Sequence, residues 1–372
     1  MHKFLLTVLG ILTGIAGCGM PDSGAKVVKV ALVCPLTGDV AAMGQGMKRG
    51  AEIAVEEANA SGRFKEIKIE LAAFDDRADP KEAVNVANQI ISDKKIAGVI
   101  GHLNSGCSIP ASQIYAKRGL LMMTSASTNP KLTLQGLKNV FRICTTDDVQ
   151  GGFAANYFID KLKINRAAVI HDKTSYGQGL AEEFKKQFDA RSGKILSFDG
   201  INIGDKDFRA LLTSIKNKKP SLIYFGGMYT EGGLITKQAK ELGLKVPVVS
   251  GDGVFTPEFI KIGGNATEGD YASMIGIPSD KLPKAKSFIE RYKAKYPGVD
   301  MQPYDTYTYE AISLLIEAVE KAGKEPAQIV SYVAGVKYRG ILGETAFDAK
   351  GDTLNKTVSI YRIKNGKFVY CE

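Results

Sequence analysis

The sequence predicts an α/β protein made of two doubly wound lobes, each built on a parallel sheet. At 372 residues the chain is too long for one ordinary hydrophobic core, because single cores stop growing at about 250–300 residues. Short β-branched runs alternate with amphipathic helical patterns along most of the chain, as expected for βαβ units. The alternation breaks at Thr145-Thr146-Asp147-Asp148 and then restarts, which indicates a second lobe.

The first lobe opens with a strand at residues 27–33, whose nearly continuous β-branched run is typical of a strand buried on both faces. A helix with apolar residues at helical spacing follows. Asp79-Pro80-Lys81-Glu82 marks the start of the next helix, because Asp is a favoured N-cap and Pro a favoured first residue. The remaining elements expected here are a helix at 44–60 and strands at 67–74, 96–100, 119–123 and 139–143.

The second run of alternating elements starts with a helix expected at residues 152–162. It continues with strands at 166–171, 194–198, 221–225 and 246–250. The helices between these strands are one that ends at 188 and two at 207–217 and 231–242. The chain then turns helical, at 283–296, 304–322 and 326–333, and ends in strands at 357–363 and 368–370. Asn365-Gly366 between these last two strands favours a hairpin turn.

The N-terminus reads as a secretory signal segment, residues 1–18. Lys3 precedes an apolar run, and the segment ends in Ile15-Ala16-Gly17-Cys18, which is too short and too rich in small residues for a spanning helix. This ending resembles the bacterial lipobox, in which the cysteine becomes the lipidated first residue. An ordinary cleaved signal with a chance cysteine is the alternative. Residues 19–26 then form a short tether.

Charge and cysteine content exclude several classes of function. The formal net charge is +9, but the lysines are scattered among acids, whereas nucleic-acid binding needs a concentrated basic face. The four cysteines beyond Cys18 have no tight spacing, so their pairing stays open. No CxxC or Cys/His cluster is present, so neither a metal site nor a cofactor is expected. These four are Cys34, Cys107, Cys144 and Cys371.

Two loops rich in small and hydroxyl residues follow adjacent predicted strands. The first is residues 104–108, Asn-Ser-Gly-Cys-Ser, and the second is residues 124–129, Thr-Ser-Ala-Ser-Thr-Asn. Loops at the carboxyl ends of parallel strands line the ligand crevice of such sheets. Backbone N–H groups and hydroxyls there suit a small carboxylate. The alternative is that these residues only cap helices and make turns.

Several motifs, in order and spacing, resemble one protein family along essentially the whole mature chain. The chain is similar to bacterial periplasmic binding proteins of the branched-chain amino-acid type, and within them to the leucine/isoleucine/valine-binding proteins. The motifs are Asp75-Asp76 with Asp79-Pro80-Lys81, Val99-Ile100-Gly101-His102-Leu103, Pro110-Ala111-Ser112-Gln113-Ile114-Tyr115, His171-Asp172-Lys173 with Tyr176-Gly177, and Tyr224-Phe225-Gly226-Gly227.

The resemblance implies a type I periplasmic binding protein, whose two lobes are joined by a three-crossover hinge and close on a ligand. It implies an N-terminal lobe of residues 27–146 and 277–353 and a C-terminal lobe of residues 147–276 and 354–372. It also implies the extracytoplasmic solute-binding component of an ABC importer, with an aliphatic or branched-chain L-amino acid as ligand. The expected partners are the transmembrane permease subunits and, through Cys18, the membrane of the cell envelope, with the protein itself a monomer.

The resemblance also implies the residues that hold the amino-acid head group. Ser105 matches a serine that binds the ligand carboxylate, and the loop of Ala126, Ser127 and Thr128 matches the next binding loop. There the Ala126 carbonyl would accept from the ammonium, and Thr128 would offer its hydroxyl and N–H. Tyr176 matches a second-lobe tyrosine that contacts the zwitterion. Asp252 falls where relatives carry a glutamate that pairs with the ammonium, so the acid is kept but is one methylene shorter.

The expected side-chain pocket departs further from the family. Met43 and Met228 each replace a family tyrosine, Tyr229 is adjacent to the latter, and Tyr304 stands near a family phenylalanine. Methionine adapts to varied ligands, and one methylene discriminates by only about 1–3 kcal/mol, so the sequence does not rank the aliphatic amino acids. The family's first-lobe disulfide is absent, because its two cysteine positions hold Ala78 and Asn104.

Three other functions compete with this interpretation. The same clamp could act as a ligand sensor, or could bind another small amine-containing solute. An enzyme is not expected. Residues 44–50 only superficially resemble a dinucleotide fingerprint, because the last glycine is one residue late. A hydrolase would need Ser105 or Ser108 beside His102 or His171, and no GxSxG motif surrounds these serines.

Overall fold

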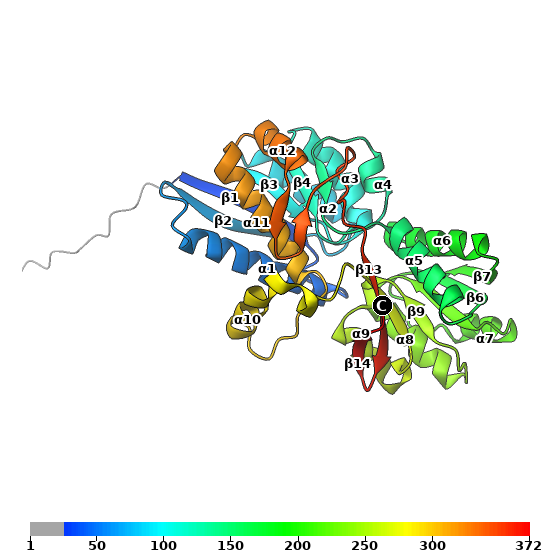
Figure 1. The fold of residues 1–372 in the computed structure, drawn as a ribbon. Helices are drawn as coiled ribbons and strands as arrows, with labels where there is room; N and C mark the ends of the chain where they lie inside the picture. Colours follow the sequence, from blue (N-terminus) through cyan, green and yellow to red (C-terminus); the bar gives the residue numbers. More distant parts are fainter. Residues whose placement is uncertain (1–25) are drawn as a thin grey trace, which may run out of the picture.

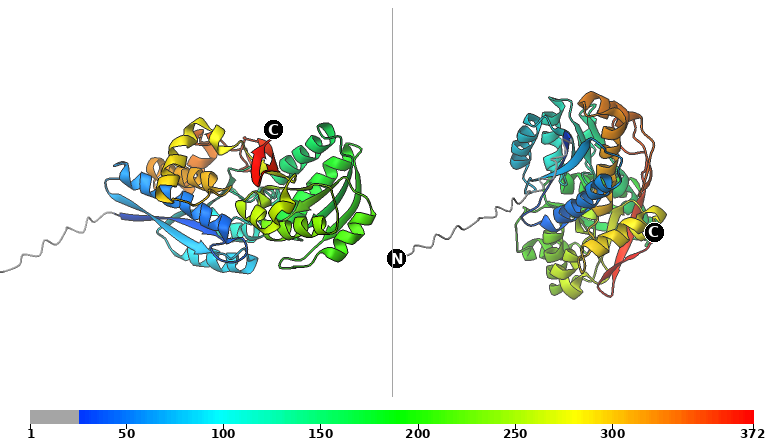
Figure 2. Two further views of the ribbon diagram at one scale, coloured as in Figure 1. Left: turned by 90° about the horizontal axis from the view of Figure 1, so that it is seen from below. Right: turned by 90° about the vertical axis from the view of Figure 1, so that its left-hand side faces the viewer.

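The structure is a computed structural model that describes residues 26–372. The predicted signal segment, Cys18 and nearly all of the tether therefore lie outside the described residues. Two α/β lobes lie side by side, with the blue, orange and cyan elements in one and the green elements in the other (Figures 1 and 2). The C-terminal strands lie with the green lobe.

A five-stranded parallel sheet forms the centre of the first lobe, in the order β2-β1-β3-β4-β5. Along β1 the buried side chains alternate between two apolar clusters. Val30 and Leu32 pack in one, and Ala31 and Val33 in the other. Both faces of the sheet are therefore covered, as predicted from the β-branched run. The strands are β1 (Lys26–Cys34), β2 (Ile67–Asp75), β3 (Ile96–Gly101), β4 (Leu121–Thr124) and β5 (Val140–Arg142).

Helices from distant parts of the sequence cover this sheet. Helix α2 begins as predicted, with the Asp79 carboxylate accepting from the N–H groups of Lys81 (2.7 Å) and Glu82 (3.0 Å). Helix α11 returns from the second lobe and packs against α1, so closely that a side chain at Gly50 would collide with the Asp305 backbone. The helices are α1 (Ala41–Ala60), α2 (Pro80–Ser92), α3 (Ser105–Ala116), α4 (Lys131–Leu134), α10 (Lys286–Lys295), α11 (Asp305–Ala322) and α12 (Pro326–Gly335).

The second lobe is built on a seven-stranded sheet in the order β14-β13-β10-β9-β8-β6-β7. It is parallel from β7 to β10, but β13 pairs antiparallel with both β10 and β14. The strands are β6 (Arg166–His171), β7 (Lys194–Gly200), β8 (Leu222–Gly226), β9 (Val248–Ser250), β10 (Tyr271–Ile275), β13 (Val358–Lys364) and β14 (Lys367–Tyr370). Its helices are α5 (Asp147–Asp160), α6 (Ser175–Ala190), α7 (Arg209–Asn217), α8 (Tyr229–Glu241) and α9 (Pro257–Gly263).

The chain passes between the two sheets after β5, after β10 and before β13, which makes a hinge of three crossings. The last crossing follows a small hairpin of β11 (Tyr338–Gly340) and β12 (Gly343–Thr345). The predicted two-lobed α/β class is therefore confirmed. The lobe boundaries at residues 146, 276 and 353 stay a prediction.

The structure differs from the sequence-based expectations at several elements. The second sheet is mixed rather than purely parallel, because the final hairpin adds to its edge. Strand β10 and helix α9 were not anticipated. Helix α5 begins at Asp147, five residues before the expected start at 152, and α3 begins at Ser105, inside the stretch expected to be a loop. In both helices the first turn is polar, which hides its helical periodicity from the apolar pattern.

Candidate functional site

The two hydroxyl-rich segments of the first lobe come together at the carboxyl ends of β3 and β4. Ser105 is the first residue of α3, and its hydroxyl accepts from the N–H of Asn129 at 3.3 Å. The Ser127 hydroxyl instead faces its own lobe, where it lies 3.1 Å from the His102 carbonyl oxygen and 2.6 Å from the Ser108 hydroxyl. Ser127 thus holds the two segments together, and its contact with a ligand stays a prediction.

Thr128 has the properties of a binding group that lacks its partner. The residue is fully buried, and its hydroxyl has no hydrogen-bond partner among the described residues. A buried unpaired hydroxyl is costly unless another group satisfies it. Ser105 and Ala126 beside it are also buried, at 1% and 4% exposure. This corner of the first lobe can therefore offer hydroxyl and backbone N–H groups to an anion.

Asp252 lies at the point where the two lobes meet. It begins the short 3₁₀ helix η1 (Asp252–Val254) after β9 and is fully buried. Tyr176 of α6 donates to Asp252 Oδ1 at 3.0 Å, and Tyr304, from the first lobe, donates to Oδ2 at 2.6 Å. Burial raises the pKa of Asp252, although the hydrogen bonds from both tyrosines oppose the rise. Three of the predicted site residues, from two lobes, are thus in direct contact.

Asp147 is a second buried carboxylate, which the sequence reasoning did not assign to the site. It is the first residue of α5, it is fully buried, and neither of its carboxylate oxygens has a hydrogen-bond partner among the described residues. Burial raises its pKa well above the usual range, the neighbouring Thr128 hydroxyl opposes that rise, and the nearby charge of Asp252 adds to it. The Thr145-Thr146-Asp147-Asp148 motif marks the predicted break between the two lobes, and this place at a crossing is the one signal that points to the site.

The four residues expected to form the side-chain pocket are all buried in one apolar cluster. Met43 comes from α1 of the first lobe, and Met228 and Tyr229 come from the start of α8 in the second. Together with Tyr304, each is less than one-tenth exposed, and all belong to the cluster that also contains Ala126 and Tyr176. This cluster extends through both lobes, so a shared pocket for the four side chains and their contact with a ligand stay a prediction.

The lobes are in contact around this region, as in a closed clamp. Thr230 of α8 donates to the Asp39 carbonyl at 3.1 Å, and Asn129 donates to the Ser175 carbonyl at 2.5 Å. These bonds lie next to Tyr229 and Thr128 in the sequence. A ligand held between Thr128 and Asp252 would consequently be enclosed by both lobes.

His102 is buried, with Nδ1 2.6 Å from Asp76 and Nε2 3.1 Å from the Tyr115 hydroxyl, so within residues 26–372 neither ring nitrogen meets a serine. No group of three or more potential ligands in this same range is placed to hold a metal. The four cysteines of this range are unpaired, three of them buried and Cys371 exposed. Among the described helices, none is long and apolar enough to span a membrane.

Comparison with known proteins decides the family. The profile of the family described as periplasmic binding protein matches residues 27–367. The chain belongs to this family. Leu/Ile/Val-binding protein homolog 1 of Brucella abortus is 38% identical over 368 residues, covering 98% of this chain and 97% of the relative. The leucine-, isoleucine-, valine-, threonine- and alanine-binding protein of Pseudomonas aeruginosa is 35% identical over 351 residues, covering 93% of this chain and 92% of its own.

Solved structures agree with this assignment. A leucine-binding protein from Thermotoga maritima superposes with a TM-score of 0.85 at 32% identity, covering 93% of this chain and 98% of that one. A second solved structure is the substrate-binding protein of a branched-chain amino-acid transporter from Streptococcus pneumoniae, in complex with isoleucine. It superposes with a TM-score of 0.85 at 28% identity, covering 93% of this chain and 100% of that one. The resemblance predicted from the sequence motifs is thereby confirmed, as is the type I periplasmic binding protein fold.

Proposed function

We propose that this periplasmic binding protein holds an aliphatic or branched-chain L-amino acid between its lobes and delivers it to an ABC importer. The observation that carries the proposal is the pair of buried carboxylates, Asp147 and Asp252, neither of which forms an ion pair among the described residues. A buried carboxylate without a cationic partner is costly, and the two tyrosine hydrogen bonds to Asp252 offset only part of the effect of its burial. An ammonium group supplies that partner.

Donors on the first-lobe side of the site support a zwitterion rather than a simple amine. The first turn of α3 at Ser105 and the unpaired Thr128 hydroxyl offer donors to a carboxylate, and a helix start adds a favourable field. The buried methionine and tyrosine side chains of the same apolar cluster suit an aliphatic side chain. Named relatives bind leucine, isoleucine and valine, which agrees with this chemistry.

The mechanism we infer is lobe closure on the ligand, with no chemistry performed on it. The contacts of Tyr304 with Asp252 and of Thr230 with Asp39 join the two lobes. A ligand that bridges the lobes stabilises this closed arrangement by its preference for it. The closed clamp is then the form presented to the permease. The family is one of solute-binding proteins, which argues against an enzyme.

A thermal-shift screen of the common amino acids and related solutes tests the function, because a ligand that binds only the folded state raises the melting temperature. We expect leucine, isoleucine and valine to give the largest shifts. A response to carboxylates or amides alone, without any amino acid, would contradict the proposal. A sensor role would leave this screen unchanged and would be revealed by a receptor rather than a permease among the binding partners.

We further propose that the mature protein is extracytoplasmic, monomeric and held at the membrane by a lipid on Cys18. Ile15-Ala16-Gly17-Cys18 supports this anchor. Mass spectrometry of the exported wild type should find an acylated N-terminal cysteine, and Cys18→Ala should release an unacylated protein. An unmodified wild-type N-terminus would exclude the anchor.

A further inference from the structure

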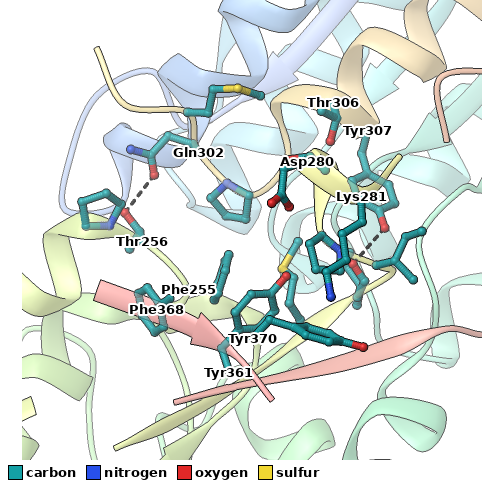
Figure 3. Close-up of a pocket in the computed structure, with 18 residues that line it drawn as sticks. Phe255, Thr256, Asp280, Lys281, Gln302, Thr306, Tyr307, Tyr361, Phe368 and Tyr370 are labelled. Carbon is teal, nitrogen blue, oxygen red and sulfur yellow. Dashed lines mark hydrogen bonds between the residues drawn. The ribbon is translucent and has the colours of Figure 1, made fainter. Parts of the chain in front are cut away.

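A cavity lies at the hinge between the two lobes. It has a volume of about 360 Å³ and is lined by residues of both lobes and of the second crossing between them. None of the residues assigned to the cleft lines it. In Figure 3 the segment with Gln302, Thr306 and Tyr307 lies above it, and the strands with Tyr361 and Phe368 lie below. Its volume is at the lower end of the range for small-molecule sites.

One wall of the hinge cavity is a continuous group of aromatic rings. The ring of Phe255 lies 4.4 Å from that of Tyr361 and 4.6 Å from that of Phe368, measured between centroids. The Tyr370 ring is 5.8 Å from that of Tyr361. Tyr370 is 39% exposed, so this wall is open to solvent at one end. Such a wall favours an apolar or aromatic side chain.

Two opposite charges face the same cavity from consecutive residues. Asp280 and Lys281 belong to the 3₁₀ helix η3 (Ser279–Lys281), and both line the cavity. Neither side chain forms an ion pair within residues 26–372, although Lys281 Nζ lies 3.5 Å from the centroid of the Tyr370 ring. Figure 3 shows both side chains directed into the cavity. A carboxylate and an ammonium beside an apolar wall are complementary to a zwitterion with an apolar side chain.

We propose that the hinge cavity is a second, weaker binding site for an amino acid with an aromatic side chain. Its ammonium pairs with Asp280, its carboxylate with Lys281, and its ring packs on Phe255, Tyr361 and Phe368. The exposed setting of the two charges makes each pair weaker than a buried one. The affinity therefore comes mainly from the aromatic wall.

The hinge cavity shares two chain segments with the ammonium end of the cleft. Phe255 directly follows the 3₁₀ helix that carries Asp252, and Gln302 lies two residues before Tyr304. The Thr256 hydroxyl, also in the cavity wall, lies 2.8 Å from Gln302 Oε1. Because the cavity exists only while both lobes contribute their walls, its occupant favours the lobe arrangement seen here. By reciprocity, it raises the affinity of the cleft for its own ligand.

A tryptophan reporter tests the proposal, because the chain contains no tryptophan. Tyr370→Trp keeps a ring in the wall and places a single indole there. Titration with L-phenylalanine should give a saturable fluorescence change that Asp280→Asn and Lys281→Met each weaken at least fivefold. Phenethylamine and 3-phenylpropionate, which each lack one charge, should bind more weakly than phenylalanine.

Control variants separate the two sites. The titration should persist in Tyr370→Trp combined with Asp252→Ala, and leucine calorimetry should be unchanged by Asp280→Asn within twofold. No saturable change, a change insensitive to both charge variants, or its loss in the Asp252→Ala background would overturn the proposal. If the cleft assignment were wrong, the result would be different: Asp252→Ala would leave the leucine affinity measured by calorimetry unchanged.

Discussion

Replacing Asp252 with asparagine removes one negative charge from the proposed ammonium site while keeping its size. The carboxylate is fully buried and receives hydrogen bonds from Tyr176 and Tyr304. Removing one partner of a buried, hydrogen-bonded charge pair costs about 2–5 kcal/mol of binding free energy. Because Asp147 stays as a second carboxylate, we expect the lower part of this range, about 2–3 kcal/mol. The dissociation constant for leucine should then rise about 30- to 150-fold.

The same substitution should not weaken the ligand-free fold. Burial raises the pKa of Asp252, so above the ordinary carboxyl pKa the ionised group lowers the free energy of unfolding. Asparagine removes that cost, and the melting temperature of the ligand-free protein should stay level or rise. Calorimetry with leucine and thermal unfolding without ligand measure the two effects.

Asp270→Asn provides a matched control. Asp270 is also a fully buried acid of the second lobe, with a pKa raised by burial to about 7, but it accepts from Val248 and Thr236 away from the cleft. The Asp270→Asn variant should bind leucine with the affinity of the wild type. Equal affinity of Asp252→Asn and the wild type within twofold would refute the reasoning, as would a loss of binding that merely follows a lower melting temperature.

Three further predictions concern pH and the hinge. Leucine affinity should fall as pH is lowered, since burial raises the pKa of Asp147 and Asp252 and the ammonium needs their ionised forms; calorimetry across pH 5–8 that shows a constant affinity would contradict this. Asp352→Asn should lower the free energy of unfolding, measured in urea, by about 3 kcal/mol, because it leaves the buried guanidinium of Arg142 without its charge partner. The double variant Arg142→Met with Asp352→Leu removes both charges and should recover part of this loss. Burial raises the pKa of Asp305 from 3.8 to about 7. Between these two pH values the folded state keeps a proton that the unfolded state releases, so the free energy of unfolding falls as pH rises. Asp305→Asn should remove up to about 4 kcal/mol of that fall, and an unchanged pH dependence of stability in this variant would contradict the assignment to Asp305.

The prediction about Arg142 also concerns the binding loop. Its guanidinium donates to the carbonyls of Ser127 (3.1 Å) and Asn129 (2.8 Å), which flank Thr128. Asp352, its charge partner, lies in the last crossing between the lobes. The buried pair thus joins the candidate carboxylate loop to the hinge, so that its loss should loosen both.

Much of the fold follows from local patterns in the sequence. The N-cap of α2 at Asp79 is visible because cap chemistry needs only neighbouring residues. The β-branched run of β1 indicates burial on both faces for a similar reason. The start of α5 at Asp147 was missed, because its first turn is held by tertiary burial rather than by an apolar stripe.

The binding site was only partly predictable, because contacts between distant segments decide which of its groups are already paired. The family resemblance suggested Ser105, Thr128 and Asp252, but a resemblance carries no information on which atoms are already paired. Only the structure shows that the Ser127 hydroxyl is bound within its own lobe and that the Asp147 carboxylate has no partner among the described residues. Pairing depends on contacts between distant segments, which local sequence patterns do not record.

The central claim, that the ligand ammonium meets Asp252, is tested most directly by one calorimetric cycle. It compares leucine and 4-methylpentanoate, which is leucine without its amine, on the wild type and on Asp252→Asn. The substitution should weaken leucine about 30-fold or more and change 4-methylpentanoate by less than threefold, because only leucine has the charge to lose. An equal loss for both ligands would show that Asp252 does not bind the ammonium and would contradict the account.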